Sequence, residues 1–359
     1  MRQLNLLIKP SSSLCNADCT YCFYRDVAAH RSLPSAGLMS QDTAHAVVDR
    51  AVDALSRGGA LHLAFQGGEP TLSGLPFFEE LFTYAAQACG QKDIAVSYSL
   101  QTNGLLLDEA WCAFLKQYDV LVGLSLDGEE AAHDRYRTDP AGGTWERVMR
   151  TAKRLTAGGV RFNAVTVVTD AVAGHPTALY RFYRKRSFDH VQLIPCLAPL
   201  GQAKGVGVPD AHAYGDFLVR FFDAWYADAV RGSGISVRLF DNYRTLLRGG
   251  AAEQCGIGGR CVPQLVVEAD GGTYPCDFYV LDEYCTGNMH GNTVEDTLRS
   301  DGLRRFMQGA GSNPACRGCR YEPLCGGGCR RYREYMPAAD GFCPIRYFFD
   351  RCLDRLANV

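Results

Sequence analysis

The sequence lacks three features that would point to a nucleic-acid-binding, membrane or exported protein. Its 359 residues carry a net charge of only −2, so the charge balance gives no reason to expect binding to nucleic acid or to an acidic membrane surface. No stretch approaches the roughly 18 consecutive apolar residues of a membrane-spanning helix. The N-terminal stretch MRQLNLLIKP has only a short apolar run before Pro10, which does not match an export signal. We therefore expect a soluble, cytoplasmic protein that binds neither nucleic acid nor membranes.

Cysteine, in contrast, is abundant. The chain has 16 cysteines, and proteins kept in the reducing cytosol use cysteine for metal binding or catalysis more often than for disulfides. With 47% hydrophobic residues, the chain is also long enough to form one large core and a smaller second unit. These features favour cysteine-ligated metal sites over disulfide bridges.

The first cysteines form a compact triplet. Cys15, Cys19 and Cys22 follow a C-x3-C-x2-C spacing directly after the short apolar run of residues 4–8. Three thiolates from one tight loop can hold three corners of a [4Fe-4S] cluster, for which a full set would be four. The fourth iron would then be open to a non-protein ligand, which could receive an electron from the cluster. A structural zinc site is the alternative, although zinc sites usually consist of paired C-x2-C units with four ligands.

Strand-like and helix-like patterns alternate over the first 200 residues. Short apolar runs typical of buried strands occupy residues 4–8, 61–65, 94–100, 120–126, 160–168 and 190–195. Segments with helical periodicity lie between them, at residues 41–55, 76–89, 108–115, 144–155 and 177–185. These six or so β-α units predict a parallel sheet with helices outside, either open or curled towards a barrel.

Polar and glycine residues follow several of the predicted strands. The sequence QGGEP (66–70) follows the second strand, QTNG (101–104) follows the third, and SLDG (125–128) ends the fourth. In such folds the site lies at the C-terminal ends of the strands, so these loops should meet the cysteine triplet at one rim.

Two of these segments suggest specific ligand contacts. Gly67 and Gly68 would let the backbone approach a ligand closely, and Glu69 could accept a hydrogen bond from an ammonium group, although a plain turn would also explain them. Arg137 could pair with a carboxylate as a bidentate fork, or it could be a solvated loop arginine.

The character of the chain changes after about residue 232. Residues 197–210 are rich in glycine and proline, and residues 212–230 form a long amphipathic helical pattern. Residues 264–268 and 272–275 predict a β-hairpin, which Cys261 and Cys276 flank. We therefore expect two domains, 1–232 and 233–359.

The second domain holds most of the remaining cysteines. They are Cys255, Cys261, Cys276, Cys285, Cys316, Cys319, Cys325, Cys329, Cys343 and Cys352. Eight of them would complete two closed four-thiolate sites for either iron-sulfur clusters or zinc, and the N-terminal triplet favours iron and sulfur. Cys89, Cys112, Cys196 and Cys352 lie in helical or strand patterns and are predicted core thiols.

The triplet, together with Gly67-Gly68-Glu69-Pro70, resembles the radical S-adenosylmethionine superfamily. The C-terminal spacing from Cys261 to Cys343 resembles the SPASM extension of that superfamily. The stretches LLIKPSSSLCNADCTYCFY, AFQGGEPTL and YPCDFYVLDEY are similar to those of anaerobic sulfatase-maturating enzymes. The resemblance implies an α/β fold in which a partial (β/α)6 TIM-like barrel precedes a Cys-rich SPASM domain with a β-hairpin and two auxiliary clusters.

The resemblance also implies cofactors and ligands. The cofactors would be three [4Fe-4S] clusters and S-adenosyl-L-methionine. The cluster ligands would fall into three sets: Cys15, Cys19 and Cys22; Cys255, Cys261, Cys276 and Cys329; Cys316, Cys319, Cys325 and Cys343. Asp277 would be the catalytic base, while Tyr24, Gln66, Ser125 and Arg137 would line the pocket for S-adenosylmethionine and the peptide. Cys285 departs from the family pattern, as either a spare thiol or an exchanged ligand.

The implied reaction is the oxidation of a peptidyl Cys or Ser in a sulfatase to Cα-formylglycine by a 5′-deoxyadenosyl radical. The substrate would be a Cys/Ser-x-Pro/Ala-x-Arg segment, and a flavodoxin or ferredoxin would donate electrons. Two alternatives remain open: a related enzyme that makes thioether, epimer or carbon-carbon crosslinks in a ribosomal peptide, and a zinc-binding scaffold without activity.

Overall fold

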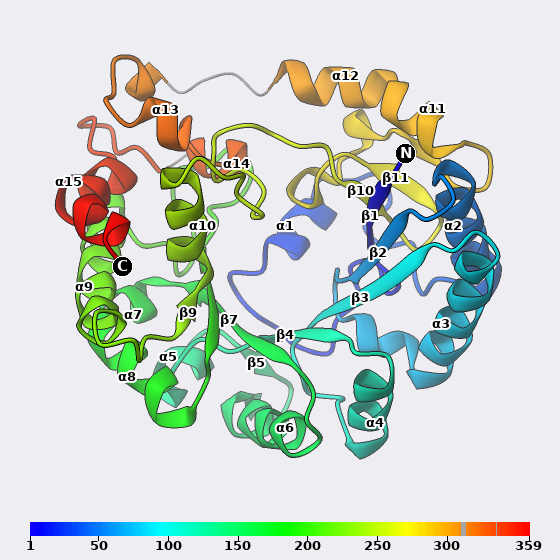
Figure 1. Ribbon diagram of the computed structural model, residues 1–359, viewed down its shortest axis with the longest axis horizontal. Helices are drawn as coiled ribbons and strands as arrows, with labels where there is room; N and C mark the ends of the chain where they lie inside the picture. Colours follow the sequence, from blue (N-terminus) through cyan, green and yellow to red (C-terminus); the bar gives the residue numbers. More distant parts are fainter. Residues whose placement is uncertain (310–313, 335) are drawn as a thin grey trace.

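The computed structural model describes residues 1–309, 314–334 and 336–359, and one curved ten-stranded sheet organises these residues. Six parallel strands form its centre: β1 (Gln3–Ile8), β2 (Ala60–Phe65), β3 (Ala95–Thr102), β4 (Leu121–Ser125), β7 (Phe162–Val168) and β8 (His190–Pro195). The strand order runs from β12 at one edge to β9 at the other, so the sheet is an open arc (Figure 1). The predicted partial barrel is confirmed.

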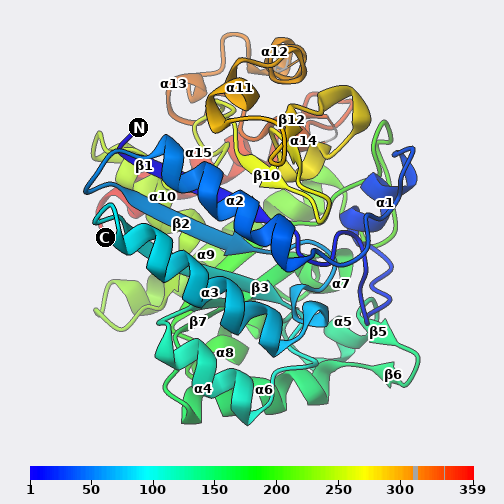
Figure 2. The same cartoon turned by 90° about the vertical axis from the view of Figure 1, so that its right-hand side faces the viewer.

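Helices cover the outer side of the arc. They include α2 (Gln41–Ala54), α3 (Leu75–Gly90), α4 (Glu109–Gln117), α6 (Trp145–Ala157), α8 (Pro176–Arg186) and α9 (Ala211–Ala229). In Figure 2, α2 and α3 lie in front of β1, β2 and β3. No helix in the described parts of the chain is both long and apolar enough to cross a bilayer.

Side chains alternate between the two faces of each strand, and this alternation creates the site. In β2, Leu61, Leu63 and Phe65 are buried beneath the helices, whereas His62 and Ala64 are half-buried on the concave face. The outer face therefore supplies the core, and small or polar residues on the inner face leave a hollow.

The C-terminal half extends the same sheet at both edges. The predicted hairpin is confirmed as β10 (Leu265–Val267) and β11 (Gly272–Tyr274), and β10 pairs in parallel with β1. At the other edge, β9 (Ser236–Val237) pairs in parallel with β8. The segment after β9 begins with α10 (Arg238–Leu247) and bridges the open side of the arc (Figure 1). Strands from both sides of residue 232 share one sheet, so the strand pairing marks no domain boundary there. The division into domains at residue 232 stays a prediction.

Candidate active site

A cavity of about 1480 Å³ lies on the concave face of the sheet. The inner faces and C-terminal ends of the central strands line one side of it, and α10 and the residues that flank the hairpin (Gln264, Cys276 and Asp277) line another. Fifteen of the predicted site residues line it: Cys15, Cys19, Cys22, Tyr24, Gln66, Gly67, Gly68, Glu69, Ser125, Arg137, Cys255, Cys261, Cys276, Asp277 and Cys329. The fold thus brings the N-terminal triplet and one of the C-terminal cysteine sets to a common space.

The loop of residues 11–24, here named the cysteine loop, is fastened to the loop after β2. The backbone N–H of Gly68 donates to the Ser12 carbonyl at 2.8 Å, and that of Glu69 donates to the Leu14 carbonyl at 2.7 Å. A Cβ atom on Gly68 would lie only 1.9 Å from the Leu14 oxygen, so only glycine permits this approach. The Gly-Gly-Glu segment therefore holds the cysteine loop in place, and its contact with a cofactor stays a prediction.

The carboxylate of Glu69 accepts four hydrogen bonds from the protein itself. It is buried; Oε1 accepts from the Thr71 N–H and from the hydroxyls of Thr71 and Thr102, and Oε2 accepts from the Asn103 N–H at 2.7 Å. Burial raises the pKa of Glu69, and these hydrogen bonds oppose that shift. The side chain joins the ends of β2 and β3, and its predicted contact with an ammonium group gains no support from this geometry.

The three thiols of the cysteine loop lie close together. Burial is the main cause that raises the pKa of Cys15 to about 12, and negative charge on Glu69, Cys19 and Cys22 raises it further. Metal ligands bind as thiolates, and thiolates crowded in this way are costly to form unless a cation binds between them. The donor set therefore fits an iron-sulfur cluster.

Asp277 lies opposite the cysteine loop, in the 3₁₀ turn η2 (Asp277–Tyr279) that follows the hairpin. Its Oδ2 accepts from the Tyr24 hydroxyl at 2.6 Å and from Gln66 Nε2 at 2.7 Å. Its Oδ1 is buried and has no hydrogen-bond partner among the described residues. Burial raises the pKa of this carboxyl, while Lys9 opposes the shift. One oxygen is thus anchored, and the other can receive a proton.

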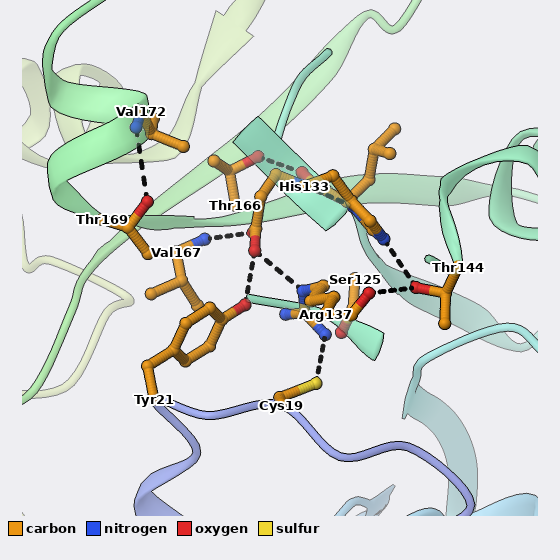
Figure 3. A network of polar contacts seen from close by, with 12 residues as sticks. Cys19, Tyr21, Ser125, His133, Arg137, Thr144, Thr166, Val167, Thr169 and Val172 are labelled. Atoms are coloured by element: carbon orange, nitrogen blue, oxygen red, sulfur yellow. Dashed lines mark hydrogen bonds and ion pairs between the residues drawn. The ribbon is translucent and has the colours of Figure 1, made fainter. Parts of the chain in front are cut away.

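Arg137 and Ser125 also line the cavity and already have partners within the chain. Nε of Arg137 donates to Asp127 Oδ2 at 2.8 Å, so the carboxylate it pairs with belongs to the protein itself (Figure 3). The Ser125 hydroxyl accepts from Gln101 Nε2 at 3.1 Å. Sequence reasoning did not single out Asp127, Gln101 or Lys9 individually, although Asp127 and Gln101 lie in the predicted strand-end loops.

The C-terminal cysteines form two separate groups. In the first, burial raises the pKa of Cys329 to about 11, with further upward contributions from Cys255 and Cys261. Cys276 is half-buried beside Cys329 and Cys255, and its pKa is raised well above the ordinary value, mainly because the sulfur loses contact with water. This grouping matches the first auxiliary set that the resemblance implies.

The second group lies outside the main cavity, around a hollow of about 90 Å³. Burial raises the pKa of Cys325 to about 11, and Cys343, Cys316 and Cys319 raise it further. Cys285, in contrast, lies beside Tyr274, and its thiol donates to the Gly287 carbonyl at 3.6 Å. The structure therefore places Cys285 away from both groups.

Close glycine contacts hold the loops that carry these thiols. A Cβ atom on Gly259 would lie 2.1 Å from the Gly326 oxygen, and one on Gly256 would lie 2.8 Å from Cys329 Cβ. The segments 255–261 and 325–329 therefore approach each other closely at these two glycines. Together with the grouped thiols, this arrangement fits two further clusters.

Comparisons with known proteins agree with this geometry. The family model described as the Radical SAM superfamily matches residues 10–177, and one described as an iron-sulfur cluster-binding domain (SPASM) matches residues 259–320. A cysteine-type anaerobic sulfatase-maturating enzyme of Clostridium perfringens (strain 13 / Type A) is 38% identical over 368 residues, which cover 100% of this chain and 99% of the relative. The chain belongs to the anaerobic sulfatase-maturating enzymes.

Other members of these anaerobic sulfatase-maturating enzymes match as well. A serine-type enzyme of Bacteroides thetaiotaomicron is 27% identical, over 96% of this chain and 87% of the relative. A solved structure described as native anSMEcpe with bound AdoMet and Kp18Cys peptide superposes with a TM-score of 0.91 at 37% identity, covering 99% of this chain and 98% of that one.

Proposed function

We propose that this enzyme oxidises a cysteine side chain of a sulfatase to Cα-formylglycine, with S-adenosylmethionine as the cosubstrate. The observation that carries the proposal is the cavity in which the cysteine loop and Asp277 face one space, in a chain of this family. When bound, the first cluster and S-adenosylmethionine supply a radical that removes a hydrogen atom from the substrate Cβ. The chain must then orient the peptide, exclude water and accept the thiol proton.

Asp277 is the group we propose to accept that proton. Tyr24 and Gln66 hold Oδ2, Oδ1 has no hydrogen-bond partner among the described residues, and burial makes the carboxylate a stronger base than an exposed aspartate. Cys276, the residue before it, belongs to the first C-terminal thiol group, so the base lies beside a proposed route for the departing electron.

The Asp277→Asn variant tests this role. We expect it to release 5′-deoxyadenosine from S-adenosylmethionine but to lose most of the aldehyde product, because asparagine cannot accept the thiol proton. Asp282→Asn is the matched control, since Asp282 is an exposed carboxylate five residues further along that bonds the Ser32 N–H. Aldehyde formation by Asp277→Asn at the native rate would show that another group is the base.

We propose cysteine rather than serine as the target. Three cysteine-type relatives are 36–38% identical to this chain, whereas three serine-type relatives are 27–29% identical. The purified enzyme should convert a Cys-x-Pro-x-Arg peptide, with a mass loss of about 18 Da, faster than the matching Ser-x-Ala-x-Arg peptide. Faster turnover of the serine peptide would reverse this assignment, and a crosslinked product would favour modification of a ribosomal peptide.

The partners follow from this reaction. A flavodoxin- or ferredoxin-type protein would supply the electron. We also propose a cytoplasmic location, which agrees with a chain that uses its cysteines as cluster ligands rather than as disulfide partners.

A further inference from the structure

Asp127 is the centre of a buried polar network at the C-terminal end of β4. Its side chain is 1% exposed; Oδ1 accepts from the Val167 N–H at 2.8 Å, and Oδ2 accepts from the Tyr21 hydroxyl and from Arg137 Nε. Tyr21 belongs to the cysteine loop, between Cys19 and Cys22. The network thus joins β4, β7 and the cysteine loop at one carboxylate (Figure 3).

Arg137 is held rigidly in this network. Its backbone N–H donates to the His133 carbonyl at 2.9 Å, and its own carbonyl accepts from the Thr144 hydroxyl at 3.1 Å. Its guanidinium lies over the Tyr21 ring, 5.4 Å from the centroid. With Nε bound to Asp127, the guanidinium has one orientation, and Nη1 donates to Cys19 Sγ at 3.8 Å.

The contact between Arg137 and Cys19 is shielded from solvent. Arg137 is 9% exposed and Cys19 is 8% exposed. Nη1 of Arg137 contacts the sulfur directly, whereas Asp127 contacts Nε of the same guanidinium, so the cation lies between the carboxylate and the sulfur and acts on the sulfur most strongly.

We propose that Arg137 raises the reduction potential of the cluster held by Cys15, Cys19 and Cys22 through its hydrogen bond to the Cys19 sulfur. This inference rests on the proposed function, which places a redox-active cluster at the cysteine loop. Reduction adds one negative charge to the cluster. A buried N–H donor with positive charge at a ligand sulfur stabilises the reduced form more than the oxidised form, and hydrogen bonds to the sulfurs are among the features that set such potentials. Arg137 is then a positioning residue that eases reduction before S-adenosylmethionine binds.

The test is a redox titration of the reconstituted enzyme, followed by electron paramagnetic resonance without S-adenosylmethionine. We compare the wild type with Arg137→Met and Arg137→Lys, after counting iron and sulfide. The titration should show three reduction waves, and Cys15→Ala identifies the wave of the first cluster because that variant abolishes it. This first wave should move to a more negative potential in Arg137→Met and by a smaller step in Arg137→Lys. The other two waves should keep their potentials.

Arg135→Met is the control for net charge. Arg135 is an exposed arginine two residues earlier, with its guanidinium over the Tyr136 ring, and removing its charge should leave all three waves in place. If Arg137→Met fails to hold the first cluster, Arg137→Gln replaces it: glutamine keeps a donor but removes the positive charge, so the first wave should still move to a more negative potential, by a smaller step.

Two outcomes would overturn the inference. One is an unchanged first wave in Arg137→Met or Arg137→Gln that carries full iron. The other is a variant whose only change is weaker binding of S-adenosylmethionine, which would assign Arg137 to the cosubstrate. A wild type that shows no iron and no reduction wave would instead reject the proposed function itself.

Discussion

His133 shows at the scale of one residue how a buried side chain makes stability depend on pH. It lies in α5 (Glu130–Asp134), Nδ1 accepts from the Asp127 N–H at 3.2 Å, and Nε2 lies 2.9 Å from the Thr144 hydroxyl. Burial lowers its pKa to about 4, Asp127 and Asp134 oppose the shift, and Arg137 adds to it. The neutral ring is therefore the folded form.

This pKa predicts a loss of stability in mild acid. An unfolded histidine titrates near pH 6.5, so between about pH 6.5 and 4 the unfolded chain binds a proton that the folded chain does not. The stabilisation that comes from keeping this ring neutral is complete above pH 6.5. About 2 kcal/mol of the free energy of unfolding should be lost between pH 7 and pH 5. The thermal midpoint of the wild type should therefore fall further over this range than that of His133→Gln.

An exposed histidine provides the comparison for this prediction. His175→Gln, at the exposed start of α8, should show the same pH dependence as the wild type. Equal pH dependence of the thermal midpoint in the wild type and His133→Gln would mean that the ring at position 133 contributes nothing to the loss of stability in acid.

The residue types of the site could be predicted from the sequence, but the partners of individual side chains could not. Arg137 was expected to pair with a carboxylate, and the carboxylate in the structure is Asp127 of the chain itself. Glu69 was expected to meet an ammonium group; that contact stays a prediction, and the structure shows four donors of the protein bound to the carboxylate. Motifs identify the chemistry of a side chain, whereas its neighbours depend on the register of strands that are distant in sequence.

At the scale of elements, apolar periodicity predicted the regular strands and helices of the α/β part. It did not predict the short irregular elements. The helix α1 (Phe23–Ala29) was missed because only Val27 of its seven residues is buried, which leaves no periodic pattern. The last helix, α15 (Pro344–Ala357), buries Phe348, Cys352 and Leu356 at intervals of four residues. That spacing is typical of a helix, but only Cys352 was assigned to a helical or strand pattern there.

The contact between Gly68 and the cysteine loop leads to a prediction about one cluster. In Gly68→Ala the new methyl group would collide with the Leu14 carbonyl and displace the loop that follows it. We expect the first cluster to be lost and the other two to remain, so iron should fall from about 12 to about 8 atoms per chain. Iron and sulfide analysis after anaerobic reconstitution measures this.

A glycine in open space serves as the control for that substitution. Gly90→Ala, at the end of α3, places its methyl group where no atom lies within 4 Å and should keep all the iron. Full iron in Gly68→Ala would mean that the cysteine loop can move without losing its ligand geometry.

At the scale of the whole molecule, the two halves are joined at the edge of β1. The pairing of residues 6–8 with 265–267 could not be predicted, because any apolar strand of this length satisfies the same pattern. A buried ion pair reinforces the joint: Lys9 Nζ donates to Glu268 Oε1 at 2.6 Å, and Arg31 Nη1 donates to the same oxygen at 2.9 Å. Glu268 directly follows β10, so this pair fixes the hairpin that carries Cys276 and Asp277.

The ion pair predicts strong coupling between residues that are distant in sequence. Glu268→Gln leaves both Lys9 and Arg31 buried without a carboxylate and should lose about 3 kcal/mol or more, whereas Lys9→Met leaves Glu268 paired with Arg31 and should lose clearly less. The double variant removes both charges and should lose clearly less than the sum of the two, with a coupling above about 1 kcal/mol. Thermal unfolding of the four reconstituted proteins gives the cycle.

An exposed pair shows what burial contributes to that coupling. Arg57 and Asp93 also form an ion pair, but their side chains are 73% and 62% exposed, so the cycle through Arg57→Met and Asp93→Asn should couple by less than about 1 kcal/mol.

Lys9 also lies over the Tyr24 ring, 5.1 Å from its centroid, and its charge acts on Asp277. The single Lys9→Met variant should therefore form less aldehyde per 5′-deoxyadenosine as well as unfold earlier. Additive stability losses at Lys9 and Glu268, with unchanged product per cleaved cosubstrate, would mean that the backbone pairing of β1 with β10 alone holds the two halves in register.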